Sequence, residues 1–168
     1  HSELYGALKL SRGGYPKDGF FLRAESFYNV ASEIERLDNI PAASPPIIDG
    51  YGGVSLHEQS HGESFMALAM NRFRGHGLYI LDEPEAALSP TAQMALLARL
   101  YELARNDSQL IIATHSVIIS ALPDADVYEI TEKGINKTEY VKTSHYNIMK
   151  HFINSPAKMV SDLTGKER

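Results

Sequence analysis

The sequence predicts an α/β fold in which a mostly parallel sheet is flanked by helices. Two apolar stretches support this prediction, at residues 78–81 and 109–114. Neither stretch shows the regular alternation of a half-exposed strand, which favours strands buried on both faces of a parallel sheet. A segment with helical spacing lies between them, as in a strand–helix–strand unit. The length of 168 residues and the hydrophobic content of 43% suit one domain with a substantial core.

The charge and composition exclude several classes of protein. The net charge of −5 and a pI near 5.8 provide no basic surface for DNA or an anionic membrane, so nucleic acid is not indicated as a partner. The chain contains no cysteine, which excludes disulfides and thiolate chemistry and fits a cytoplasmic protein. No stretch reaches the roughly 18 apolar residues of a membrane span, and no signal peptide is recognisable.

The first third of the chain predicts a strand, a helix and an irregular connection. Residues 19–25 suit a strand that ends in polar side chains, and Ser26 is placed to cap the following helix. The apolar residues of that helix fall at helical spacing and are Phe27, Val30, Ile34 and Leu37. Residues 39–53 hold three prolines and a glycine-rich end, which predicts an irregular, mobile connection.

Two further helices are expected on either side of the central strand. The first opens within residues 54–64 and ends before Gly75 and Gly77. Its apolar residues are Phe65, Leu68, Ala69 and Phe73. The second has Ser89 as its cap and Pro90 as its first residue, and it runs to about residue 105. Its apolar face comprises Leu97, Leu100 and Ala104.

The last part of the chain predicts structural elements and no site residues. Ser116 is placed to cap a short helix at residues 117–122. Residues 127–131 and 135–141 flank a glycine turn and predict a terminal hairpin. Residues 144–163 suit helix with a break near Pro156, and the sequence suggests no partners for His145 or His151, which are expected at the surface.

Three polar side chains are expected to meet at one edge of the sheet. Asp82 and Glu83 follow the central strand, where Pro84 prevents further ladder pairing. His115 follows the next strand, one strand–helix–strand unit later. Ligands of open α/β sheets bind beyond the carboxyl ends of the strands, so the sequence predicts a site at this edge. A solvated acidic turn and a structural histidine are the alternatives that either feature alone would leave open.

These residues also carry a resemblance to a known family. Residues 78–83 resemble a Walker B strand, and residues 83–90 are similar to the segment after it in ABC-type ATPase heads. The resemblance is to the soluble, non-transporter branch often described as predicted AAA-type ATPases. It implies a three-layer, P-loop NTPase-like fold that binds ATP and Mg²⁺. Asp82 would help hold the metal, and Glu83 would polarise the water that attacks the γ-phosphate, because phosphoryl transfer needs cation positioning and an oriented nucleophile.

The resemblance extends to two flanking positions. Residues 113–116 resemble the segment of the family's switch histidine, so His115 would contact the γ-phosphate and help orient the water. Glu25 stands where a glutamine of the family touches Mg²⁺ and the attacking water. Arg23 and Glu25 could equally form a surface pair, and the sequence leaves both interpretations open.

The segment Ser60-His61-Gly62-Glu63 resembles the ABC signature motif, whose core is Ser-Gly-Gly-Gln. In that family the serine, the glycine amides and a helix amino terminus hold the γ-phosphate of ATP bound to the opposite subunit. Ser60 and Gly62 match, Glu63 replaces the glutamine and His61 replaces the first glycine. The resemblance therefore implies a homodimer in which these residues act across the interface.

No G-x-x-x-x-G-K-[S/T] phosphate loop occurs in the chain. The resemblance covers roughly residues 20–131, and the chain starts at His1 without an initiator Met, so a phosphate loop is expected upstream. The chain is therefore expected to be a single-domain fragment, inactive alone. We expect its parts to be a strand, helix and linker (1–53), the signature, Walker B and switch-histidine region (54–131), and a hairpin with helices (132–168).

Two alternatives remain open from the sequence. The same residues would serve a non-catalytic module that dimerises when it binds nucleotide. In addition, His57, Glu58 and His61 satisfy the H-E-x-x-H pattern of zinc peptidases, with Glu83 or Glu85 as a possible third ligand. Glycines on both sides of that pattern argue against the helix that the zinc motif requires.

Overall fold

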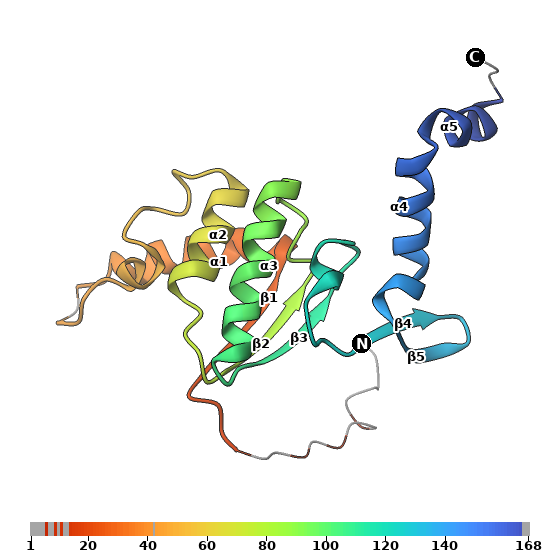
Figure 1. Ribbon diagram of the computed structural model, residues 1–168. Coiled ribbons are helices and arrows are strands. Elements are labelled where there is room, and N and C mark those ends of the chain that lie inside the picture. The colour runs from red at the N-terminus through yellow and green to blue at the C-terminus, as the bar shows by residue number, and fades with distance from the viewer. Residues whose placement is uncertain (1–5, 7–8, 10, 12–13, 42, 166–168) are drawn as a thin grey trace.

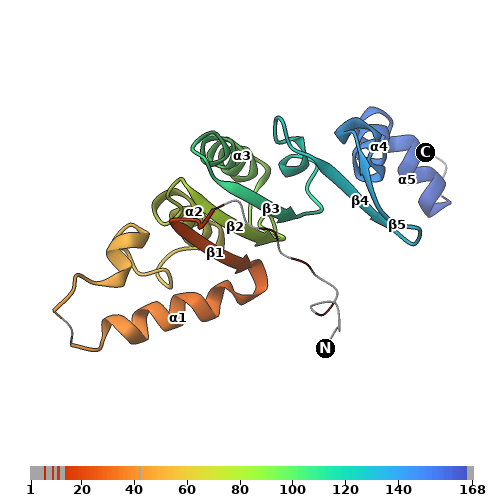
Figure 2. The ribbon, with the colours of Figure 1, turned by 90° about the horizontal axis from the view of Figure 1, so that it is seen from below.

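The computed structural model describes residues 6, 9, 11, 14–41 and 43–165, which fold around a three-stranded parallel sheet (Figures 1 and 2). Its strands are β1 (Asp18–Arg23), β2 (Gly77–Asp82) and β3 (Gln109–Ala113), in the order β1-β2-β3. Both neighbouring pairs are parallel. Strands β4 (Val127–Thr131) and β5 (Gly134–Thr138) form a separate antiparallel hairpin. The predicted α/β fold with a parallel sheet, flanking helices and a terminal hairpin is confirmed.

Helices connect the strands and extend the chain beyond the hairpin. The five α-helices of the described residues are α1 (Phe27–Asp38), α2 (His61–Asn71), α3 (Pro90–Arg105), α4 (Ser144–Asn154) and α5 (Pro156–Thr164). Short 3-10 turns cover Ala24–Ser26, Ile47–Tyr51, Ile119–Ala121 and Tyr140–Lys142. Helices α4 and α5 project away from the sheet and bury none of their side chains (Figure 1). None of the helices in the described part of the chain combines the length and apolarity needed to cross a membrane.

A single apolar core joins one face of the sheet to the helices. Alternate side chains of the strands point into it, so that Leu22, Tyr79 and Leu81 are fully buried. The helices contribute the remaining core side chains, which include Phe27, Ile34, Phe65, Leu68, Leu96, Leu100 and Leu103. This packing fixes the positions of the strands, and therefore of the loops that follow them.

The opposite face of the sheet is more open than the sequence predicts. Phe21, Ile80 and Ile111 are paired across the three strands and so share this face. Phe21 is 64% exposed and Ile111 is 50% exposed, whereas Ile80 between them is half-buried. The prediction that the apolar strands are buried on both faces is therefore wrong for β3, which has exposed residues, while β2 has none. The helices described by the structure cover the other face, and an apolar run alone does not show which faces are covered.

The helix boundaries follow local signals where the side chain makes the expected bond. Helix α3 spans the predicted residues because the Ser89 hydroxyl accepts a hydrogen bond from the Ala92 amide. Ser26 precedes α1 as predicted, but its side chain makes no capping bond, and β1 ends at Arg23 rather than at residue 25. Leu37 and Ala104 were expected on apolar faces and are exposed instead.

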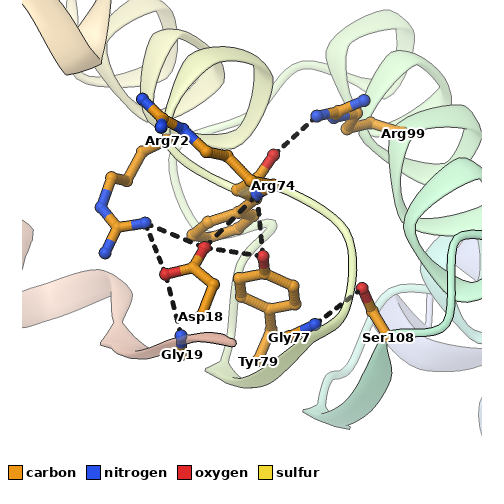
Figure 3. A network of polar contacts seen from close by, with 9 residues as sticks. Asp18, Gly19, Arg72, Arg74, Gly77, Tyr79, Arg99 and Ser108 are labelled. Atoms are coloured by element: carbon orange, nitrogen blue, oxygen red, sulfur yellow. Dashed lines mark hydrogen bonds and ion pairs between the residues drawn. The ribbon is translucent and has the colours of Figure 1, made fainter. Parts of the chain in front are cut away.

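A partly buried polar network ties the amino-terminal ends of the strands to the end of α2 (Figure 3). The Asp18 carboxylate accepts hydrogen bonds from Arg72 Nη1 at 2.8 and 2.9 Å and from the Tyr79 hydroxyl at 2.9 Å. Tyr79 Oη in turn accepts a bond from the Arg74 amide at 2.8 Å. Burial acts to raise the pKa of Asp18, but the bonds from Arg72 and Tyr79 outweigh it and lower that pKa. Burial and the bond to Asp18 raise the pKa of Tyr79 to about 12.

We expect Asp18→Asn to lower the free energy of unfolding at neutral pH by about 1–3 kcal/mol, because the bonds to a charged acceptor are weakened or lost. A carboxyl whose pKa is lowered in the folded state stabilises the fold above its ordinary value of 3.8. That stabilisation is lost as the pH falls below this value, through the folded-state pKa. Urea unfolding should therefore show a smaller difference between wild type and variant in acid than at pH 7.

The matched control is Asp126→Asn, since Asp126 forms an exposed pair with Lys137. That variant should stay within about 0.5 kcal/mol of wild type. If the difference in unfolding free energy between Asp18→Asn and wild type did not change with pH, the role given to the Asp18 carboxylate would be contradicted.

Candidate functional site

The register of the parallel sheet brings three strand ends to one level. Arg23 is paired with Asp82, and Asp82 with Ala113. The Glu83 amide donates a hydrogen bond to the Ala113 carbonyl at 2.8 Å, which extends this alignment one residue beyond β2. The polar residues that follow each strand are therefore delivered to one edge of the sheet.

Glu83 has an unusual backbone conformation at this edge. Its φ is +50°, in the left-handed region that non-glycine residues seldom adopt. Pro84 is buried, and the Ala86 amide bonds back to the Glu83 carbonyl at 3.1 Å, so the chain turns sharply here. Strained backbone of this kind concentrates at functional sites. The turn leaves the Glu83 side chain exposed beside the end of the strand.

A cavity of about 440 Å³ opens at the same edge. Among the predicted site residues, Glu25, Asp82 and Glu83 line it, and its other lining residues are Arg23, Ala24, His61, Ala86 and Ala87. His115 approaches from β3, and its Nε2 lies 3.6 Å from Oε1 of Glu83. The structure thus brings together the residues predicted at the strand ends. The volume lies within the range of small-molecule sites.

Arg23 is a member of this cluster that the sequence analysis treated only as a surface residue. Its Nε donates to Asp82 Oδ2 at 2.8 Å, and its Nη1 donates to Glu25 Oε1 at 3.3 Å. The hydrogen bond with Asp82, followed by the charges of Asp82 and Glu25, raises the pKa of Arg23. The spacing of Arg23 and Glu25 hinted at their pairing, but the bond to Asp82 depends on the register of β1 against β2.

The carboxylates suit Mg²⁺ better than an ion that needs a complete protein cage. Across the described part of the chain, no three His, Cys, Asp or Glu side chains are grouped closely enough to hold a metal ion by themselves. Mg²⁺ usually takes one or two carboxylates and completes its octahedral shell with water and substrate phosphates. Asp82 fits that requirement when Arg23, which donates a hydrogen bond to Oδ2 of Asp82, shares or releases that oxygen.

The signature-like segment forms the amino terminus of α2. Ser60 is the N-cap, and its hydroxyl accepts a hydrogen bond from the Glu63 amide at 3.3 Å. The Glu63 carboxylate accepts from the Ser60 amide at 2.9 Å and from its hydroxyl at 2.6 Å, which completes a capping box. These bonds lower the pKa of Glu63. Both side chains therefore have a structural role at an exposed helix end, beside any role toward phosphate.

Gly62 has a packing reason to be glycine. A Cβ at this position would lie 2.7 Å from the Ala87 carbonyl oxygen, closer than real Cβ contacts allow. The amino terminus of α2 therefore packs directly on the turn that follows Glu83. This contact connects the signature-like segment to the loop that carries the acidic pair.

The zinc-peptidase pattern lacks the geometry that its chemistry requires. Helix α2 begins at His61, so His57 and Glu58 precede it and the two histidines do not share a helical face. His57 Nε2 lies 3.2 Å from the Ser32 hydroxyl, whereas the His61 ring packs edge-on against Phe27 at 5.7 Å. These environments differ, so the zinc hypothesis finds no support in this part of the structure.

Glu85 positions the loop that carries His115, a role that the sequence analysis missed. Its Oε1 accepts hydrogen bonds from the His115 amide at 2.7 Å and the Ser116 amide at 3.0 Å. Its Oε2 is buried and has no hydrogen-bond partner among the described residues. The carboxylate thus connects the loop after β2 to the loop after β3. The sequence offers no local signal for this bond, because Glu85 and His115 are far apart along the chain.

Comparison with known proteins gives two matches. A family model described as "AAA domain, putative AbiEii toxin, Type IV TA system" matches residues 10–121. The chromosome partition protein Smc of Mycolicibacterium paratuberculosis (strain ATCC BAA-968 / K-10) is 44% identical over 69 residues, which are 41% of this chain and 6% of that protein. The chain therefore spans a small part of the length of this relative. No solved structure gives a significant match. The matches confirm the resemblance to an AAA/ABC-type ATPase region.

We expect Glu85→Ala to speed amide hydrogen exchange at residues 115 and 116, because both amides lose their acceptor. The cost in unfolding free energy should be about 1–3 kcal/mol. Glu85→Gln keeps a side-chain oxygen at this place, so both the exchange rates and the unfolding free energy should change less than in Glu85→Ala.

The control is Glu102→Ala, which removes an exposed carboxylate of α3 that pairs with Arg99. It should leave exchange at residues 115 and 116 as in wild type. Equal exchange rates in Glu85→Ala and Glu102→Ala would show that the Glu85 carboxylate does not hold this loop.

Proposed function

The chain belongs to the family of AAA domains described as putative AbiEii toxin, Type IV TA system, and we propose that it binds and hydrolyses ATP with Mg²⁺. In this proposal the chain supplies the carboxylates and the histidine of an ABC-type ATPase head. In this proposal the protein acts in the cytoplasm. ATP is available there, and a chain without cysteine does not depend on disulfide bonds for its stability.

One observation carries the proposal: Glu83, which lines the cavity at the sheet edge together with Asp82, lies 3.6 Å from His115. A carboxylate and an imidazole at this distance leave no room for a water molecule directly between them, but a single water molecule beside the pair can contact both groups. Phosphoryl transfer to water requires such an oriented nucleophile and compensation of phosphate charge, with little covalent chemistry by the protein. The cavity is also large enough for part of a nucleotide.

Each residue then has a defined task. Glu83 accepts a hydrogen bond from the attacking water and aims the water oxygen at the γ-phosphorus. His115 donates a hydrogen bond to the γ-phosphate and limits the movement of the water. Asp82 and Glu25 would hold Mg²⁺, directly or through water. Bound Mg²⁺ would offset the charge on the phosphate oxygens. The left-handed backbone at Glu83 supports this assignment, because it sets the direction in which the Glu83 side chain leaves the chain at the end of the strand.

We propose that Ser60, Gly62 and Glu63 contact the γ-phosphate of ATP held by a second copy of the protein. Their place at the amino terminus of α2 supports this, because helix amino termini favour anions. The side chains of Ser60 and Glu63 are exposed, so a partner can reach them. The phosphate loop would come from a segment outside these 168 residues.

Glu83→Gln in the complete protein should slow steady-state phosphate release by about 10²- to 10⁴-fold, because glutamine cannot act as the base. ATP binding should change little, since the substitution keeps the size of the side chain. A trapped ATP complex should also accumulate as a dimer in size-exclusion chromatography. Nucleotide binding without phosphate release in wild type would favour the non-catalytic dimerisation module instead.

Glu58→Gln is the matched control, because it makes the same change at an exposed glutamate just before α2. Its turnover should equal that of wild type. If Glu58→Gln abolished activity while Glu83→Gln preserved it, the proposed ATPase site would be wrong.

A further inference from the structure

A second imidazole lies against His115. The ring of His145, at the start of α4, has its centroid 5.3 Å from that of His115, with 53° between the ring planes. His115 itself faces Glu83 at 3.6 Å. His115 therefore lies in contact with Glu83 through one ring nitrogen and with the ring of His145 as well. His145 lies beyond residue 121, where the family match ends.

The chain around His145 is fastened to the loop that carries His115. The Tyr140 hydroxyl, just before α4, donates a hydrogen bond to the Val117 carbonyl at 2.8 Å. The Ser144 amide donates to the Glu129 carboxylate at 2.8 Å, which ties the first residue of α4 to β4. Thr143, the N-cap of α4, is buried. These bonds come from different elements, so the contact between the two rings does not depend on the exposed body of α4.

His115 needs such a support in order to act on a bound phosphate. Its side chain is 71% exposed, and Glu85 holds only the backbone of its loop. An exposed imidazole exchanges between rotamers, and only some of these face Glu83. A second ring packed against it disfavours the rotamers that turn away, because those rotamers lose the van der Waals contact between the two rings.

We propose that His145 is a positioning residue for His115, which holds that imidazole toward Glu83 and the phosphate site. This role rests on the proposed function. It gives the first turn of α4 a part in the reaction, because displacing that turn would remove the ring against which His115 packs. The sequence predicted no partner for His145, so this role could be inferred only from the structure.

The contact can be tested on the 168-residue chain by NMR of the histidine ring protons. His145→Ala should shift the His115 ring resonances, because a neighbouring ring current is lost. His145→Phe, which keeps a ring, should leave them closer to wild type. His151→Ala makes the same change farther along α4 and should leave the His115 resonances unmoved. An unmoved His115 signal in His145→Ala would overturn the proposal.

The positioning role is tested in the complete protein by steady-state kinetics. His145→Ala should lower kcat by about 2- to 10-fold, the range expected from one aromatic contact, with KM for ATP nearly unchanged. His145→Phe should restore most of the loss, and His151→Ala should match wild type. Equal kcat in His145→Ala and His151→Ala would remove the role.

ATP hydrolysis by the protein and the positioning role of His145 can be disproved separately. If wild type bound ATP but released no phosphate, the proposed hydrolysis would fail, and the positioning role with it. If wild type and the control variant hydrolysed ATP normally while His145→Ala was unaffected, only the role of His145 would be lost.

Discussion

The in-register parallel pairing of β1, β2 and β3 is the constraint on which the candidate site depends. It sets Arg23, Asp82 and Ala113 at one level, so that the residues after each strand meet at the same edge. A shift of one residue between neighbouring strands would turn the core-facing side chains to the opposite face. Burial of Leu22, Tyr79 and Leu81 against the helices therefore protects the site as well as the fold.

The loops beyond the strands are tied together by polar and close backbone contacts instead of apolar packing. Glu85 holds the backbone of the His115 loop, and Gly62 lets α2 pack on the carbonyl of Ala87. The capping box of Ser60 and Glu63 shapes the adjoining helix end. Ser60, Gly62 and Glu63, which the family resemblance assigns to ATP binding, thus also stabilise the start of α2. Both roles require the same backbone conformation.

The sequence predicted what local signals control. The Ser89-Pro90 start of α3, the glycine turn of the hairpin and the break before Pro156 all appear where expected, because each depends on neighbouring residues. The openness of the sheet face at Phe21 and Ile111 was missed, because an apolar run does not reveal which helices cover it. The Arg23–Asp82 bond and the His115–His145 contact were missed for a related reason. Each joins residues from different elements and leaves no mark in either local segment.

The central claim is that the strand ends surround one metal–nucleotide site, and paramagnetic broadening tests it most directly. In the complete protein with ATP and Mn²⁺ in place of Mg²⁺, the account predicts the strongest loss of amide signals at Asp82, Glu83 and His115. Signals at the opposite ends of the same strands should persist better, since the two ends of β2, a strand of six residues, are five steps of about 3.3 Å apart. Broadening centred on His57 and His61, or none at Glu83 and His115, would contradict the account.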